Sequence, residues 1–441
     1  MHLGHIDGVM PARVKVKPSR IKRVGFLSTR IAGTDGVSLE THKWAAALKR
    51  LGHECFFIAG ELEEEDKHTW RIREAALTHP EIQKIQRQCF GKQSRHRALS
   101  KAIDDSLVRI KDHLYRCQKK LKLDLWIAEN CLALPMHIPL GLALTEFLAE
   151  TSLPCIAHHH DFYWERERFA ITAVSDYLPA AFPPKLPSVT HVVINSVAGA
   201  QLSYRLGFSP TLVPNVMDFE NSPPKPDKFA QGFRSDIGVR DDQWLILQPT
   251  RVVRRKMIEH AIELVRRLDD PRAQLVVTHG LHDEGDAYLH YIRRFAKMLG
   301  VPVKFVHDWV GDHRLTRAPG TGHKQYTLAD VYHHADLVTY PSEYEGFGNA
   351  FLEAVYYRKP VMCNRYSIYR TDIEPKGFEA ITMDGFVTDA TVKRARAVLE
   401  GRSLRRTIVE HNYKLGRRFF SYTVLEKKLQ ALLAEIIGVP Q

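Results

Sequence analysis

The strongest constraint on the fold of this chain is a repeated alternation of short apolar runs and amphipathic helical segments. The first series begins with residues 23–28, passes through a glycine-containing loop into a helical segment at 38–51, and returns to an apolar run at 54–59. Such a strand, helix, strand unit predicts parallel strands in a doubly wound α/β sheet. The alternation continues as far as Val213, with a charged helical insertion expected at 61–122.

The alternation breaks at a proline-rich stretch, Ser222-Pro-Pro-Lys-Pro-Asp227, and starts again at Trp244. Because 441 residues exceed the size at which single cores stop growing, roughly 250–300 residues, two domains are expected. We predict one Rossmann-like domain of residues 1–216 and a second of residues 217–441. The last helical segment, 423–437, is expected to pack on its own domain or back on the first.

Composition and charge restrict the class of protein. With 44% apolar and 26% charged residues, the chain has the composition of a globular protein. The net charge of +12 favours an anionic substrate, a membrane surface or nucleic acid. Nucleic acid is not expected as a partner, because the basic residues are scattered and no binding motif surrounds them. Residues 1–20 lack the apolar core of a signal peptide, and the six cysteines form no Cys-x-x-Cys pair, which favours a cytoplasmic location.

The segment that most clearly indicates chemistry is Glu343-Tyr-Glu-Gly-Phe-Gly-Asn-Ala-Phe-Leu-Glu353. It follows a predicted strand at 336–339 and leads into a predicted helix at 350–357. A helix that starts after a glycine turn favours binding of a diphosphate, because its first amides lack partners and the helix dipole is positive there. Glu345 and Glu353 bracket the turn, and carboxylates accept hydrogen bonds from sugar hydroxyls.

This Glu-x7-Glu arrangement resembles the signature of the GT4 family of retaining GT-B glycosyltransferases. The resemblance implies two Rossmann-like domains that face each other across a cleft, and transfer of a hexose from a nucleotide diphosphate sugar. It implies that Glu345 contacts the transferred sugar and that Glu353 binds the ribose. The residues between them that would bind the donor phosphates are Gly346, Phe347 and Gly348.

A second match follows the first strand of the second series, where Arg251 and Lys256 lie five residues apart. Cations at the carboxyl end of a strand can neutralise a diphosphate and stabilise the leaving nucleotide. The family has an Arg and a Lys at this spacing, which implies that role for Arg251 and Lys256. The neighbouring Arg254 and Arg255 are expected to be surface residues.

In the first series, the run of three histidines that ends at His160, followed by Asp161, resembles a strand of the family that ends in His-Asp. The resemblance implies that His160 contacts the transferred sugar near its reacting carbon, and we assign Asp161 to acceptor binding. Consecutive residues of an extended chain alternate in direction, so the three histidines cannot bind one ion and no metal site is expected. No cofactor is required beyond the nucleotide-sugar co-substrate, and a divalent metal such as Mg²⁺ is not indicated.

The loop after the first strand contains Asp35 and Gly36, at the place where the family has a glycine-rich turn that admits donor phosphate and acceptor. The resemblance implies donor binding for Gly36. Asp35 either contacts the acceptor or is only part of a turn-forming Asp-Gly pair.

The matches occur in the expected order over nearly the whole chain and predict a retaining hexosyltransferase that uses GDP-mannose or UDP-glucose. Segments 129–136 and 158–166 are similar to a branch that acts on small soluble acceptors, such as glucosylglycerate-type compounds. Three alternatives stay open. They are a nucleotide-sugar epimerase of the same architecture, a glycosyltransferase that meets a phospholipid-linked acceptor at a membrane surface, and a noncatalytic sugar or nucleic-acid binder.

Overall fold

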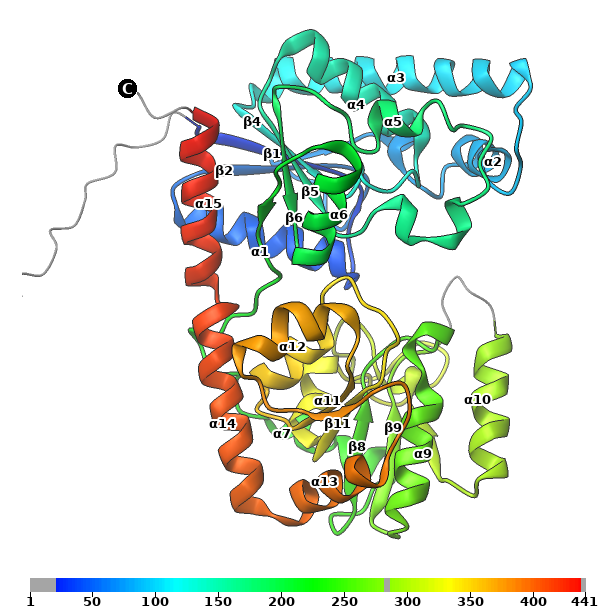
Figure 1. Cartoon of the computed structure of the whole chain (residues 1–441), viewed down its shortest axis with the longest axis vertical. Coiled ribbons are helices and arrows are strands. Elements are labelled where there is room, and N and C mark those ends of the chain that lie inside the picture. The colour runs from blue at the N-terminus through cyan, green and yellow to red at the C-terminus, as the bar shows by residue number, and fades with distance from the viewer. Residues whose placement is uncertain (1–20, 281–285, 438–441) are drawn as a thin grey trace, which may run out of the picture.

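The computed structural model describes residues 21–280 and 286–437. Residues 1–20, on which the expectation about a signal peptide rests, lie outside the described residues. The described chain forms two α/β domains, one above the other in Figure 1, each built around its own parallel sheet. This confirms the predicted fold class of two Rossmann-like domains.

The first sheet has seven parallel strands in the order β3-β2-β1-β4-β5-β6-β7. The strands are β1 (Arg23–Ile31), β2 (Glu54–Leu62), β3 (Thr69–Arg71), β4 (Leu125–Glu129), β5 (Cys155–His159), β6 (Val189–Val193) and β7 (Thr211–Leu212). The order reverses beside β1, because the chain first builds outward through β2 and β3 and then returns to add β4 on the other side. In doubly wound sheets, ligands bind at such a switch point, outside the carboxyl ends of the strands.

The second sheet repeats this arrangement with six parallel strands in the order β10-β9-β8-β11-β12-β13. The strands are β8 (Trp244–Gln248), β9 (Ala273–Val277), β10 (Val303–Phe305), β11 (Leu337–Tyr340), β12 (Val361–Asn364) and β13 (Ile381–Met383). Its switch point lies between β8 and β11. The loops after these two strands contain most of the predicted donor-binding residues.

Helices cover both faces of the first sheet, as the alternation of side chains along its strands requires. Trp126 of β4 belongs to the core under α2, α3 and α4, whereas its neighbour Ile127 belongs to the core under α1 and the last helix, α15 (Tyr422–Ile437). The helices of this half of the chain are α1 (Gly36–Arg50), α2 (Pro80–Cys89), α3 (Arg97–Leu121), α4 (Ile138–Thr151), α5 (Leu178–Ala181) and α6 (Ser196–Leu206).

The second sheet is covered in the same way. Leu245 and Leu247 of β8 pack in a core with α8, α11 and α12, and Ile246 packs in a core with α9, α10 and α13. The helices are α7 (Lys228–Gln231), α8 (Phe233–Asp236), α9 (Ile258–Leu268), α10 (Ala287–Met298), α11 (Leu328–His334), α12 (Asn349–Tyr356), α13 (Asp389–Glu400), α14 (Arg402–Phe419) and α15 (Tyr422–Ile437).

The last two helices connect the domains. Figure 1 shows α14 along the second domain and α15, the red helix, continuing along the first. Leu425 and Leu429 of α15 are fully buried in the core of the first domain, and Arg50 of α1 pairs with Glu426 at 2.5 Å. The predicted division at residues 216 and 217 lies between β7 and β8, and it stays a prediction.

The structure differs from the predicted elements at two short edge strands. The insertion at 61–122, expected to be helical, contains α2 and α3 but also β3, and β13 was not predicted at all. Each of these strands has three residues, and neither follows an α-helix, so neither continues the alternation of strand and helix from which strands are predicted. Both lie at or next to the edge of a sheet, so neither changes the switch points.

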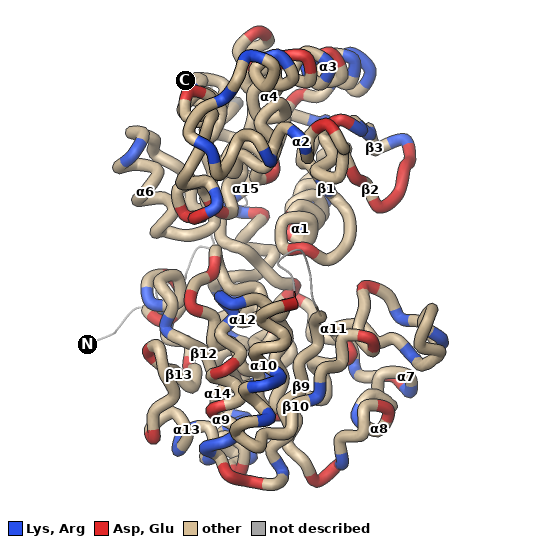
Figure 2. Tube along the Cα trace, turned by 90° about the vertical axis from the view of Figure 1, so that its right-hand side faces the viewer, with Lys and Arg blue, Asp and Glu red and all other residues tan. Residues whose placement is uncertain are grey.

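Charged residues of both signs are interspersed over both domains in the view of Figure 2. On α3, for example, Lys101 pairs with Asp105 at 2.9 Å, and Arg109 pairs with Glu81 of α2 at 2.5 Å. No helix among the described residues is long and apolar enough to cross a lipid bilayer.

Candidate active site at the domain junction

Two loops at the switch point of the second sheet bring Lys256 and Glu345 together. Lys256 lies in a 3₁₀ turn (Arg254–Lys256) after β8, and Glu345 lies in the segment after β11. We call residues 343–348 the Glu345 turn. The Lys256 ammonium forms an ion pair with Oε1 of Glu345, and each of the two side chains is 9% exposed. The predicted sugar-binding carboxylate and the predicted phosphate-binding lysine are therefore direct neighbours.

Arg255 also contacts Glu345, with 3.2 Å between its Nη1 and the carboxylate Oε2. The expectation that Arg255 is a surface residue is therefore wrong, whereas Arg254 is exposed as expected. The reason is the 3₁₀ turn, in which successive side chains point about 120° apart. Two of its three basic residues face Glu345, and the third faces solvent. This direction could not be read from the spacing of the residues.

Burial and charge act in opposite directions on this cluster. Burial disfavours the ionised form of Glu345, but Lys256 and Arg255 outweigh that effect and hold its pKa at about 2. Burial also lowers the pKa of Lys256, which Glu345 opposes and the charges of Arg255 and Arg251 reinforce. Two cations thus contact one carboxylate, with the exposed Arg251 near Lys256, and the excess of positive charge suits an anionic group.

Helix α12 begins immediately after the Glu345 turn. Gly348 is its N-cap residue and has a φ of 127°. A Cβ at this position would lie 2.3 Å from the Tyr366 hydroxyl oxygen, which donates a hydrogen bond to the Phe347 carbonyl at 3.0 Å. Only glycine fits here without rearrangement. The first amides of α12 have no partner within the helix, and they lie next to the Lys256 cluster.

The Phe347 side chain contributes to the core rather than to a binding surface. It is 3% exposed and packs edge-on against Phe420, with ring centroids 5.4 Å apart. Only its main chain is available for the predicted contact with phosphate.

Glu353 lies one turn into α12 and accepts a hydrogen bond from the Tyr332 hydroxyl at 2.8 Å. Burial raises the pKa of Glu353 and Glu40 adds to this, while the Tyr332 hydrogen bond and the charges of Lys43 and Lys256 oppose it. Glu40 and Lys43 belong to α1 of the first domain. Glu353 is therefore close enough to the first domain for charged residues of that domain to affect its pKa.

At the facing edge of the first sheet, Glu129, His158 and His160 form one buried group, which we call the carboxylate–histidine cluster. Glu129 pairs in register with His158 of the neighbouring strand. Its Oε2 lies 2.9 Å from His158 Nδ1 and 3.3 Å from His160 Nε2. His159 points the other way, with its Nε2 2.9 Å from Nδ1 of His191. No role was predicted for Glu129, although its position at the carboxyl end of a strand is where polar site residues gather.

The carboxylate–histidine cluster is also the group in which metal binding has to be considered. Its three ligand atoms lie within 4.8 Å of one another. Two imidazoles and one carboxylate are a poor donor set for Mg²⁺, which prefers oxygen ligands. Because Glu129 accepts from both imidazoles, hydrogen bonding alone accounts for the close spacing. The absence of a metal stays a prediction.

Asn130 fixes the chain at His160 and Asp161. It has a φ of 58°, and its Oδ1 accepts from the main-chain amide of His160 at 3.0 Å. Asp161 forms an ion pair with Arg166, whose guanidinium lies 6.0 Å from the ring centre of Tyr344 in the Glu345 turn. The predicted acceptor residue therefore lies beside a cation and close to the second domain.

The two domains touch where these groups lie. A Cβ at Gly346 would be 3.1 Å from the carbonyl oxygen of His160, and the Gly346 carbonyl accepts from Asn195 Nδ2 at 2.7 Å. A Cβ at Gly36 would be 3.4 Å from Nδ2 of Asn349, the first residue of α12. The structure thus brings the starts of α1 and α12, the Glu345 turn and His160 to one place.

Asp35 has a structural role in this arrangement. Its Oδ1 accepts from the amides of Val37 and Ser38, both at 3.1 Å, and its Oδ2 accepts from the Ser38 hydroxyl at 2.6 Å. These contacts cap α1. Acceptor binding by Asp35 stays a prediction.

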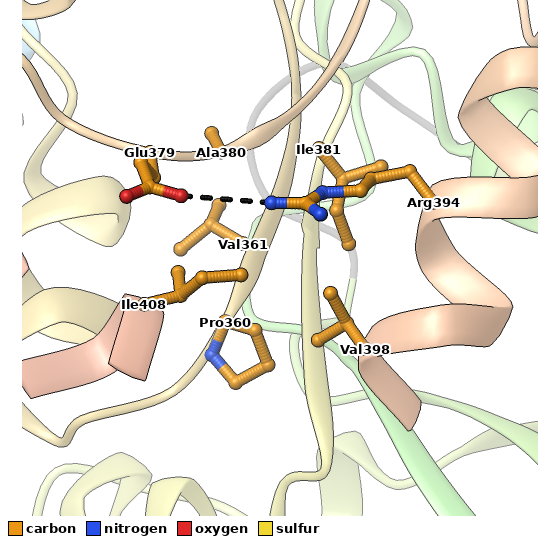
Figure 3. A pocket seen from close by; sticks show the side chains of 8 residues that line it. All are labelled: Pro360, Val361, Glu379, Ala380, Ile381, Arg394, Val398 and Ile408. Carbon is orange, nitrogen blue, oxygen red and sulfur yellow. Dashed lines mark ion pairs between the residues drawn. The ribbon is translucent and has the colours of Figure 1, made fainter. Parts of the chain in front are cut away.

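The cavity in Figure 3 lies away from this junction, between β12, β13, α13 and α14. Its volume is about 10 Å³, close to the minimum for a single water molecule. Its wall is mainly apolar, with Glu379 and Arg394 paired at 3.5 Å across one side. It is a packing defect at the edge of the second sheet rather than a binding site.

Comparison with known proteins indicates the same class of enzyme as the geometry of the site. Residues 231–415 match the family described as glycosyl transferases group 1. The chain is 30% identical to the mannosylglucosylglycerate synthase of Thermotoga maritima over 92% of its own length and 98% of that protein. It is 31% identical to the protein of the same name from Petrotoga mobilis, over 82% of its own length and 86% of the relative.

Solved structures show the same fold. The sucrose-phosphate synthase of Thermosynechococcus elongatus superimposes with a TM-score of 0.67 over 94% of this chain and 99% of that one, at 16% identity. With the two parallel sheets in Rossmann order, this identifies the GT-B architecture. The similarity to the two synthases covers 92% and 82% of the chain, and the chain therefore belongs to the glycosyl transferases group 1 family.

Proposed function

We propose that this enzyme transfers a mannosyl group from GDP-mannose to glucosylglycerate, or to a closely similar sugar-glycerate, with retention of anomeric configuration. The two synthases named above support the product class. Mannose is the sugar in their name that glucosylglycerate does not already contain, which favours GDP-mannose over UDP-glucose as the donor.

The observation that carries this proposal is the meeting of three features at the domain junction. They are the cationic cluster around Glu345, the uncapped start of α12, and His160 of the other domain, whose carbonyl oxygen lies against Gly346. In the proposal, the donor diphosphate binds to Lys256, Arg251 and the first amides of α12. Its mannose lies between Glu345 and His160, and its ribose hydroxyls bind to Glu353.

Retention follows from where the acceptor enters. In the proposal, the acceptor hydroxyl approaches the same face of the sugar that the phosphate leaves, and the departing phosphate helps to take its proton. The protein supplies orientation and stabilises the negative charge that develops on the leaving group. Lys256 and Arg251 are proposed to supply that stabilisation.

The acceptor is proposed to bind on the first domain beside Asp161 and Arg166. A glycerate carboxylate needs a cation, and Arg166 is partly exposed, with 27% of its side chain accessible. The net charge of +12 also favours an anionic substrate over a neutral one. A carboxylate-free analogue should therefore be a much poorer acceptor.

A transfer assay tests the proposal directly. The enzyme is incubated with GDP-mannose or UDP-glucose, each with glucosylglycerate, glycerate, a methyl glucoside or phospholipid vesicles. We expect product from GDP-mannose with glucosylglycerate, and the anomeric one-bond carbon–hydrogen coupling should show the configuration of the donor sugar. Conversion of the donor without an acceptor would indicate an epimerase, and transfer only to lipid would indicate a membrane-surface enzyme. An inverted product would exclude the retaining mechanism.

A further inference from the structure

Glu129 is the centre of the carboxylate–histidine cluster, and His160 is the one side chain of the proposed donor and acceptor sites with which it forms a contact described above. Its carboxylate is fully buried, with 0% of the side chain exposed. Burying an ionised carboxylate without a charged or hydrogen-bonding partner costs much free energy, so the partners of Glu129 must balance its charge. The two imidazoles, His158 and His160, are the partners that it has.

The two histidines are held differently. His158 is buried, and its ring stacks on Trp44 of α1 at 4.1 Å between centroids. His160 is 8% exposed and lies at the domain junction, with its carbonyl against Gly346. Its main-chain amide is fixed by Asn130 and its Nε2 by Glu129, so ring and backbone are both fixed.

We infer that Glu129 is a positioning residue of the transfer reaction, which turns Nε2 of His160 inward and keeps the ring as a hydrogen-bond donor toward the transferred sugar. The inference rests on the proposed function for its consequence in catalysis. With Nε2–H donated to Glu129, the remaining nitrogen, Nδ1, is the one available to the donor sugar. His160 then acts by donating a hydrogen bond and not by accepting a proton.

The charges around the ring agree with this assignment. Burial disfavours the charged form of His160, but Glu129, Glu40 of α1 and the adjacent Asp161 outweigh it and raise its pKa. Burial lowers the pKa of His158, and the positive charge of His160 adds to this. Of the two rings, His160 is therefore the one whose surroundings favour the protonated form.

The other charged or titratable groups near His160 either face away from it or are paired with another residue. His159 faces away toward His191, and burial lowers the pKa of both rings. Lys43 pairs with Glu40 at 2.6 Å. On the second domain, the Glu345 turn lies against His160, and its carboxylate is paired with Lys256 and Arg255.

The test replaces Glu129 by glutamine, which keeps the shape and removes the charge. His160 should then lose its proton at lower pH. The kcat of Glu129→Gln should fall on the alkaline side by about tenfold for each unit by which the pKa drops, with little change in the KM for the donor. The deficit should shrink as the pH is lowered. A merely structural role would lower kcat at every pH alike.

The matched control is Glu165→Gln. Glu165 is a partly buried carboxylate of the same domain that accepts from the Phe162 amide at 2.7 Å, and it does not contact His160. It should leave the pH profile unchanged. Glu129→Asp retains the charge and should keep the alkaline limit near that of the wild type, although with a lower kcat.

A second measurement needs no substrate. Imidazole nitrogen NMR of the wild type over a pH titration, assigned with His160→Gln, should show that His160 keeps its second proton to a higher pH than His158. Loss of the second proton from His160 at the same pH as from His158, or at a lower one, would overturn the inference, whether or not Glu129→Gln folds. An unchanged alkaline limit in folded Glu129→Gln would also overturn it, as would one equivalent of tightly bound metal that Glu129→Gln loses. Absence of transfer by the wild type would refute the proposed function and leave the NMR result to decide about Glu129.

Discussion

Helices α1 and α12 begin beside each other where the domains meet, but their N-termini are occupied in opposite ways. The start of α1 is capped by its own carboxylate, because Asp35 accepts from two first-turn amides and from the Ser38 hydroxyl. The start of α12 follows Gly348, which has no side chain to offer. Both follow a glycine-containing loop after a central strand, so the sequence pattern is similar.

The difference indicates that a helix N-terminus without a cap from its own chain is the better candidate for binding an anion. The positive end of α1 is compensated by Asp35. The positive end of α12 is left open and is reinforced by Lys256 and Arg255. Donor phosphate is therefore expected at α12, and the predicted donor contact of Gly36 is limited to close approach of the backbone.

The largest effect is expected from removing the cation beside the open helix. Lys256→Met keeps the apolar part of the side chain but leaves Glu345 with Arg255 alone. The value of kcat/KM for transfer should fall by about 100- to 1,000-fold, since such interactions act on the charge of the leaving group. Initial rates measure this.

The control for Lys256→Met is Lys359→Met. Lys359 is another mostly buried lysine of the second domain, where burial lowers the pKa to about 8, and it donates to the His333 carbonyl at 2.8 Å. It lies outside the proposed site, so this variant should keep its rate even if its melting temperature falls. Near-normal turnover by folded Lys256→Met would remove Lys256 from the donor site.

A smaller effect is expected from adding a side chain at Gly348, the N-cap residue of α12. Gly348→Ala places a Cβ 2.3 Å from the Tyr366 hydroxyl in a strained backbone conformation. The free energy of unfolding should fall by roughly 1–3 kcal/mol, and binding of GDP by calorimetry should weaken about tenfold as the first amides move.

The control for Gly348→Ala is Gly300→Ala, which separates the effect of backbone strain from the loss of the phosphate-binding amides. Gly300 also has a positive φ, of 66°, but a Cβ there would meet no atom within 4 Å. It should lower stability and leave GDP affinity unchanged. Equal affinities for the two alanine variants would contradict a role of the α12 terminus in phosphate binding.

The smallest effect is expected from removing the carboxylate that caps the N-terminus of α1. Asp35→Ala removes the cap and should lower the free energy of unfolding by about 1 kcal/mol, measured by denaturant titration. Asp35→Asn should retain the cap and most of the stability. If Asp35 only caps α1, both variants keep the wild-type KM for glucosylglycerate, and a large rise in that KM would show that Asp35 binds the acceptor.

Much of the architecture could be predicted from local patterns. The apolar run at 244–248 and the helical periodicity at 258–268 coincide with β8 and α9, because strand and helix periods are properties of neighbouring residues. β3 and β13 could not be predicted, since neither follows an α-helix and the alternation of strand and helix does not extend to them. Glu345, Lys256 and His160 could be selected because the segments around them resemble those of a known family, and each of them follows a strand, where parallel sheets collect their binding residues.

The sequence by itself determined two doubly wound domains and the loops that carry the chemistry, since periodicity and glycine turns act over a few residues. Only the tertiary structure decided which side chains meet. Arg255 contacts Glu345 90 residues away, and Glu129 contacts His160 31 residues away. Such contacts depend on which strands are neighbours and on how each loop turns. Strand order and loop direction are set by the packing of the whole chain, so neither Arg255 nor Glu129 could be placed in the site in advance.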